Sequence, residues 1–282
     1  MKKKRVLYWA LVVMLSLVIV TCIGLIAAKL IGDAQDKNEY DDLASIMESA
    51  KEAAKYTDPT DPPATVPTDP TDPNAPTDSA PTTPLPTLPV SNILYEYQLL
   101  YEINSDMVGW ITIDGTEINY PVVQSLYEPN FYLRKNFYKE KATCGTIYVR
   151  ESCNVNTPSD NVTLYGHNMR NGTMFADLHN YKDPAFWASN RFVQFNTLTE
   201  YHEYEIFAIF KTSATMGEGF RYHVFEDAAN EEEYNEFVAQ CKELSFYDTG
   251  ITPQYGEKLL TLSTCDKTID NGRLVVVARR VS

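Results

Sequence analysis

The stretch Leu259-Leu260-Thr261-Leu262-Ser263-Thr264-Cys265 is followed, after a short polar loop, by Gly272-Arg273-Leu274-Val275-Val276-Val277-Ala278. Both runs are apolar and rich in β-forming residues, and Asn271-Gly272 between them is a strong turn signal, so the two runs predict neighbouring strands. The first run ends on Cys265 and the second opens on Arg273. A thiol beside a fixed positive charge ionises more easily, and the thiolate is the nucleophilic form. Arginine also offers N–H donors to an oxyanion. The pair therefore predicts a nucleophilic cysteine with a cationic partner.

A proton carrier is the third group that such chemistry needs, and His167 is the best candidate. It follows the apolar run Val162-Thr163-Leu164-Tyr165 and precedes a polar turn, where a side chain can reach a cleft. We expect the other three histidines, His179, His202 and His223, to be structural or surface residues.

The five cysteines call for different interpretations. Cys22 lies in an apolar N-terminal segment, and Cys144, Cys153 and Cys241 have no charged chemistry around them. The sequence leaves open whether Cys144 and Cys153 form a disulfide. The spacing from Cys265 to Arg273 excludes a Cys-x5-Arg phosphatase loop. No cysteine or histidine cluster has the spacing of zinc ligands, so we expect neither a metal nor another cofactor.

Eight short runs after residue 100 have the composition of strands, and many short strands in one domain predict a barrel or a sandwich. A helix is expected at Asn230–Leu244, because Phe237, Val238 and Cys241 are spaced for one face. Another is expected shortly before residue 104. The predicted strands are 110–113, 120–124, 146–149, 161–165, 191–195, 203–211, 258–264 and 274–281.

The motifs resemble those of sortases, the membrane-anchored cysteine transpeptidases of Gram-positive bacteria. The resemblance rests on Thr261-Leu262-Ser263-Thr264-Cys265 with Arg273 downstream, and on Tyr165-Gly166-His167-Asn168 upstream. Residues 104–111, 118–124 and 172–178 resemble class B sortases in particular. The resemblance covers residues 91–282, and its motifs are specific jointly rather than singly.

This resemblance implies a mainly β fold: a closed eight-stranded barrel with an N-terminal helix and a helix inserted between strands six and seven. It implies His167, Cys265 and Arg273 as catalytic residues. It also implies that Ser263 and Asp266, which flank the thiol, contact the signal peptide.

The N-terminus predicts a membrane anchor. Residues 1–5 form a basic tail, and residues 6–31 form the predicted transmembrane segment, in which 6–28 carry no charge. Those 23 residues would span about 35 Å as a helix, enough for a hydrocarbon core of about 30 Å. The basic flank predicts a cytoplasmic N-terminus and an extracytoplasmic remainder. The competing interpretation is a cleaved signal peptide, whose apolar region would be shorter.

Between the anchor and the catalytic domain at 91–282 lie two further segments. Residues 32–56 are polar and helix-permissive, with few apolar anchors. Residues 57–90 hold 11 of the 16 prolines and repeat Thr-Asp-Pro four times. Such a composition cannot bury a core and favours extended polyproline II. We expect a spacer that lifts the domain into the cell wall; the alternative is a disordered connector without a length requirement.

The formal net charge is −14 at pH 7, and the predicted catalytic domain carries most of it. An acidic domain argues against nucleic acid as a partner, because phosphate binding needs a basic face. By resemblance, the expected partners are secreted proteins with a sorting signal and a peptidoglycan amine. Two alternatives stay open: a pilin-polymerising sortase, and a wall-located binding module that keeps the barrel without turnover.

Overall fold

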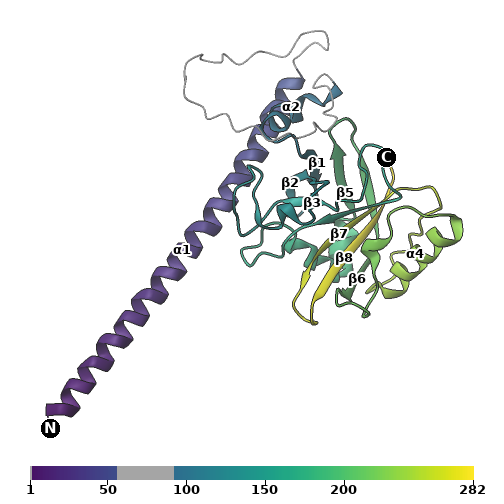
Figure 1. Cartoon of the computed structure of the whole chain (residues 1–282). Coiled ribbons are helices and arrows are strands. Elements are labelled where there is room, and N and C mark those ends of the chain that lie inside the picture. Colours follow the sequence, from purple (N-terminus) through teal and green to yellow (C-terminus); the bar gives the residue numbers. More distant parts are fainter. Residues whose placement is uncertain (1, 56–91) are drawn as a thin grey trace.

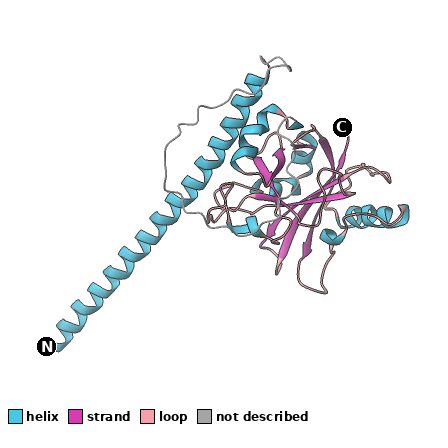
Figure 2. Ribbon diagram, turned by 45° about the horizontal axis from the view of Figure 1, so that its top comes forward, coloured by secondary structure: helices cyan, strands magenta, loops and turns pink. Residues whose placement is uncertain are grey.

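The computed structural model describes residues 2–55 and 92–282 (Figure 1). The predicted spacer at 57–90 lies outside these residues. The described part comprises one long N-terminal helix and a β-barrel with short helices around it, which Figure 2 shows coloured by secondary structure.

Helix α1 (Lys2–Ala54) is continuous from the apolar segment into the polar one. Among the described residues it is the one helix long and apolar enough to cross a membrane. Its large apolar side chains between Met14 and Ile31 are at least half exposed, whereas Tyr40, Leu43 and Met47 are buried in the core of the barrel domain. These three residues are three and four positions apart and so share one helix face. Figure 1 accordingly shows the second half of α1 against the barrel and the first half running away from it.

Eight strands close into a barrel in the order β1-β2-β3-β4-β7-β8-β6-β5, with β5 pairing back onto β1. Two neighbouring pairs are parallel, β2 with β3 and β4 with β7, and the others are antiparallel. The strands are β1 (Met107–Thr112), β2 (Asn119–Val123), β3 (Ile147–Val149), β4 (Asn161–Tyr165), β5 (Phe192–Thr197), β6 (Glu203–Ser213), β7 (Leu259–Asp266) and β8 (Gly272–Arg280).

The uninterrupted apolar runs of β7 and β8 are explained by burial on both faces. Leu274, Val276 and Ala278 point into the barrel core, while Val275 and Val277 belong to a second, outer cluster. Helix α4 (Glu231–Leu244) covers that outer face, where it buries Tyr234, Phe237, Val238 and Cys241. A strand buried on both faces has no reason to alternate polar and apolar residues.

The remaining helices are short and lie in the connections. They are α2 (Tyr95–Ile103), α3 (Pro184–Ser189) and the 3-10 helices η2 (Phe131–Arg134), η3 (Ala176–Lys182) and η4 (Tyr222–Val224). The predicted helix at the start of the domain is α2, and the one inserted between strands six and seven is α4. Asn230 caps α4, because its side chain accepts a hydrogen bond from the Glu233 amide at 3.0 Å. The predicted fold, a closed eight-stranded barrel with these helices, is confirmed.

Candidate active site

Strands β7 and β8 place the predicted nucleophile and the predicted cation opposite each other. In their antiparallel register Cys265 pairs with Arg273. Residues directly opposite in such a pair project from the same face of the sheet. Asn271 takes the left-handed conformation with φ 47° just before β8, so the predicted turn residues do end the connection. The pairing of thiol and guanidinium follows directly from this register.

His167 reaches the same region because β4 runs parallel to β7. Tyr165 is level with Ser263, and the Gly166 amide then donates to the Ser263 carbonyl at 3.1 Å. Position 166 has no room for a side chain: a Cβ there would lie 2.5 Å from Ile147 and 2.6 Å from Phe175. Glycine therefore lets the chain pass close to the core, and the next residue, His167, emerges beside the end of β7.

The ring of His167 is oriented by a main-chain carbonyl. Its Nε2 lies 2.8 Å from the carbonyl oxygen of Leu133, in η2, so Nε2 carries a proton and donates to it. The nitrogen left for proton exchange is Nδ1. Burial lowers the pKa of His167, and the nearby charge of Arg134 lowers it further, although the Leu133 carbonyl opposes both. The neutral form of this histidine is therefore favoured more than in water.

These three residues surround one cavity of about 430 Å³. The cavity opens at the ends of β4, β7 and β8, and η2 and η4 form its sides. Its lining residues are Asn130, Leu133, Thr146, Tyr148, Arg150, Glu151, Tyr165, Gly166, His167, Ala214, Tyr222, His223, Ser263, Thr264, Cys265 and Arg273.

The Arg273 guanidinium is held from one side only. Its Nη1 donates to the main-chain carbonyls of Gly272 at 3.0 Å and Asn271 at 3.2 Å. Within residues 2–55 and 92–282, Nε and Nη2 have no hydrogen-bond partner. An arginine fixed through one nitrogen keeps its other donors available to an oxyanion or a substrate carbonyl.

The two predicted peptide-contacting residues are placed differently from each other. Ser263 lines the cavity, and its hydroxyl lies 2.6 Å from the hydroxyl of Tyr222. The side chain of Asp266 is 1% exposed and lies within an ion cluster with Lys182 and Lys211. Contact of these residues with a peptide stays a prediction.

Sequence reasoning overlooked other residues near Cys265. His223, for which the sequence predicts a structural or surface role, lines the cavity. Asn168 and His179 both contact the carbonyl oxygen of Cys265 at 3.1 Å. Asn168 was signalled by its place in the Tyr-Gly-His-Asn motif. His179 had no such signal, because it lies 86 positions from Cys265 in the chain.

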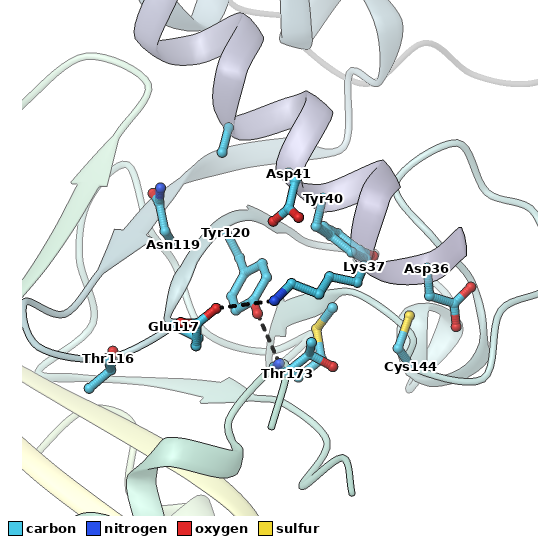
Figure 3. A pocket seen from close by; sticks show the side chains of 12 residues that line it. Asp36, Lys37, Tyr40, Asp41, Thr116, Glu117, Asn119, Tyr120, Cys144 and Thr173 are labelled. Atoms are coloured by element: carbon cyan, nitrogen blue, oxygen red, sulfur yellow. Dashed lines mark hydrogen bonds and ion pairs between the residues drawn. The ribbon is translucent and has the colours of Figure 1, made fainter. Parts of the chain in front are cut away.

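A second cavity, of about 220 Å³, lies between α1 and the barrel and shares no lining residue with the first (Figure 3). Tyr40 of α1 donates from its hydroxyl to the Gly145 carbonyl at 2.7 Å, and Lys37 pairs with Glu117 at 3.5 Å. Cys144 lies in the wall of this cavity and is a free thiol, as is Cys153, so the disulfide left open does not form in this structure.

A closed mixed barrel with a cysteine, an arginine and a histidine around one cavity is the arrangement of sortase-type cysteine transpeptidases. Residues 111–281 match the family model described as the sortase domain, and the chain belongs to the sortase family.

The relatives indicate class B. The chain is 34% identical to sortase B of Listeria monocytogenes over 190 residues, which cover 66% of this chain and 74% of that protein. It is 28% identical to sortase B of Staphylococcus aureus over 186 residues, 65% and 74% of the two chains. The enzyme is thus class B-like.

Solved structures agree. A Bacillus anthracis protein similar to sortase B superposes with a TM-score of 0.60 at 35% identity and covers 67% of this chain and 84% of that one. A Staphylococcus aureus sortase B–substrate complex superposes with a TM-score of 0.70 over 89% of this chain and 99% of that one; at 22% identity it supports the fold alone.

Proposed function

We propose that this protein is a membrane-anchored transpeptidase that cleaves a C-terminal sorting signal of secreted proteins and joins them to a peptidoglycan amine. The observation that carries the proposal is the register of β7 and β8, which sets Cys265 opposite Arg273 on the wall of the cavity that His167 also lines. We assign catalysis to these three residues.

In the first half of the reaction the Cys265 thiolate attacks a backbone carbonyl carbon of the sorting signal. A C–S bond forms and the carbonyl oxygen becomes an oxyanion, towards which the free donors of Arg273 are available. The C–N bond then breaks, and His167 in its charged form gives a proton to the leaving amine. The product is a thioacyl enzyme and a neutral His167.

In the second half an acceptor amine enters and loses a proton to His167 as it attacks the thioester. A new C–N bond forms, the C–S bond breaks and the Cys265 thiolate is regenerated. The reactive state needs a thiolate and a charged histidine together. Burial lowers the pKa of His167, which makes its charged form rarer at pH 7, so a slow enzyme is expected.

Ser263 and Asp266 contribute to peptide binding in different ways in this proposal. The Ser263 hydroxyl, beside that of Tyr222, offers a polar contact inside the cavity. The carboxylate of Asp266 is occupied by two lysines, so any contact with the peptide comes through its backbone.

We infer that α1 is a single-pass anchor with a cytoplasmic N-terminus and an extracytoplasmic catalytic domain. The support is the basic stretch of residues 2–5 before the apolar segment. A protease added to intact protoplasts should cut between residues 57 and 90 and digest no cytoplasmic control protein. Full protection of the catalytic domain from the protease would contradict the proposed orientation and indicate the opposite one.

The proposed reaction is tested by mass spectrometry of the full-length enzyme with a library of sorting-signal peptides. The expected result is a Cys265 adduct with the mass of the N-terminal peptide fragment, which an added amine removes. Transfer only to a lysine side chain of a pilin subunit would indicate the polymerising sortase. Peptide binding without any adduct would indicate a binding module and refute the proposed reaction.

A further inference from the structure

The carbonyl oxygen of the nucleophilic residue is held by two side chains. Asn168 Nδ2 donates to the Cys265 carbonyl at 3.1 Å, and His179 Nε2 lies 3.1 Å from the same oxygen. Asn168 follows His167 in the loop after β4, and His179 belongs to η3. The end of β7 is thus held by the segment after β4, which also carries His167.

The neighbour of His179 determines which ring nitrogen carries the proton. The Lys182 ammonium lies 2.8 Å from Nδ1. An ammonium group has donors and no acceptor, so Nδ1 must accept and the proton is on Nε2. Nε2–H then donates to the Cys265 carbonyl, and Asn168 Nδ2, which lies 2.9 Å from Nε2, donates to the same oxygen. The pKa of His179 is lowered by burial and by the charge of Lys182, against the opposing effects of the Cys265 carbonyl and Asp266, so the ring is neutral at neutral pH.

Lys182 is in turn fixed by Asp266, the residue after the nucleophile. The Asp266 carboxylate accepts from Lys182 at 2.9 Å and pairs with Lys211 at 3.2 Å, while the Thr268 amide donates to its other oxygen at 2.8 Å. A chain of contacts therefore runs from the Asp266 side chain through Lys182 and His179 back to the Cys265 carbonyl. It encloses the peptide bond between the two residues.

We propose that His179 is a positioning residue: with Asn168 it holds the backbone of Cys265 so that the thiol faces the cavity between His167 and Arg273. This inference rests on the proposed function, in which Cys265 is the nucleophile. His179 exchanges no proton with substrate, because one nitrogen is committed to the carbonyl and the other to Lys182. A displacement of about 1 Å at a reacting atom costs up to about 100-fold in rate, which is the scale of effect that such a clamp prevents.

Two substitutions of His179 test whether the hydrogen bond to the Cys265 carbonyl matters apart from the loss of the imidazole ring. In His179→Gln the side-chain amide reaches about as far as Nε2 and can still donate to the Cys265 carbonyl. In His179→Asn the amide reaches only the position of Nδ1. Full-length enzyme in detergent should keep kcat within about threefold in the Gln variant. In the Asn variant kcat should fall by about 10- to 100-fold, with KM changed by less than about twofold.

The matched control is His202, changed to Gln and to Asn. His202 is also largely buried, but its Nε2 pairs with Glu200 at 3.3 Å on the β5–β6 turn. Neither variant should change kcat. Equal losses of kcat in both His179 variants, in step with a lower Tm, would show a merely structural role and overturn the proposal.

The pH dependence of Cys265 alkylation by iodoacetamide is a second readout. The rate should fall in His179→Asn, and the apparent pKa values of the profile should stay those of the wild type. A shifted profile in His179→Gln would make His179 a proton carrier and overturn the proposal. Alkylation needs no peptide, so it tests the positioning role of His179 even in an enzyme that cleaves no sorting signal. Failure of the wild-type enzyme to cleave any sorting signal would separately refute the proposed function.

Discussion

The cavity beneath α1 and the cavity at the ends of β7 and β8 each contain one cysteine, in contrasting surroundings. Cys144, in the first, is 2% exposed. Burial raises its pKa well above the usual range, and the carboxylates of Asp36 and Glu39 on α1 raise it further. Cys265, in the second, is half-buried and lies opposite Arg273.

The comparison teaches that a place on a cavity wall does not make a thiol reactive. Reactivity follows from solvent access and from the sign of the nearest charge. Helix α1 brings carboxylates to Cys144, and β8 brings a guanidinium to Cys265. The carboxylate nearest to Cys265 in sequence, Asp266, has two lysines to neutralise it.

The largest expected effect separates the two cysteines by mutation. Cys265→Ala should reduce sorting-peptide cleavage by more than about 10³-fold, because the nucleophile is lost. Cys144→Ala should leave cleavage within about twofold. Chromatography of the cleaved peptide measures both, with circular dichroism to confirm folding. Residual turnover near the wild-type level in Cys265→Ala would mean that another cysteine is the nucleophile.

Alkylation compares the same thiols without catalysis. At pH 7.5 iodoacetamide should modify Cys265 at least about 100-fold faster than Cys153, because Cys153 is buried and burial raises its pKa to about 11. Cys144 and the fully buried Cys241 should be slower still. Peptide mapping by mass spectrometry gives the individual rates. Comparable labelling of Cys144 would contradict the proposed contrast.

Arg273→Lys tests whether charge alone distinguishes the two sites. Lysine keeps the positive charge but loses the planar fork of donors, so kcat should fall by about tenfold or more. The matched control is Arg279→Lys. Arg279 lies on the same strand, pairs with Glu205 and Glu257, and should tolerate the change without loss of activity. Near-normal rates in Arg273→Lys would show that only charge matters there.

The smallest effect concerns Asp266. Burial alone would raise its pKa, but Thr268 and the two lysines outweigh burial and hold the pKa well below the ordinary value. A depressed folded-state pKa adds stability that is present above the unfolded value, about 3.9, and is lost as pH falls through the folded value. Asp266→Asn should therefore lower the free energy of unfolding by about 1–2 kcal/mol between pH 5 and 7, and this deficit should shrink below about pH 4, where the wild-type protein loses the contribution as well. Urea unfolding from pH 2 to 7 measures the slope, and an unchanged slope would mean that other carboxylates dominate.

Sequence patterns predicted the barrel strands well because burial of a strand or a helix face requires apolar residues at fixed spacings within a few positions. The apolar runs of β7 and β8, the turn at Asn271-Gly272 and the helix face of Phe237, Val238 and Cys241 are each visible within a few residues. His167 could be selected because it follows a strand and lies within a motif.

Features that depend on distant parts of the chain were missed. Tyr40, Leu43 and Met47 have helical spacing, but the acidic residues among them concealed a face that packs on the barrel. The contact of Lys182 with Asp266 joins positions 84 residues apart. Only the alignment of β4 with β7 brings η3 beside Cys265, and no local pattern reports that alignment.

The continuity of α1 has a mechanical consequence. With its apolar half in a bilayer, as proposed, Tyr40 lies nine residues beyond Ile31, about 14 Å along the helix axis. The hydrogen bond from Tyr40 to Gly145 then joins the barrel to the part of α1 that lies just outside the membrane. In the proposed membrane setting, a change in the tilt of α1 would therefore change the orientation of the catalytic cavity relative to the bilayer.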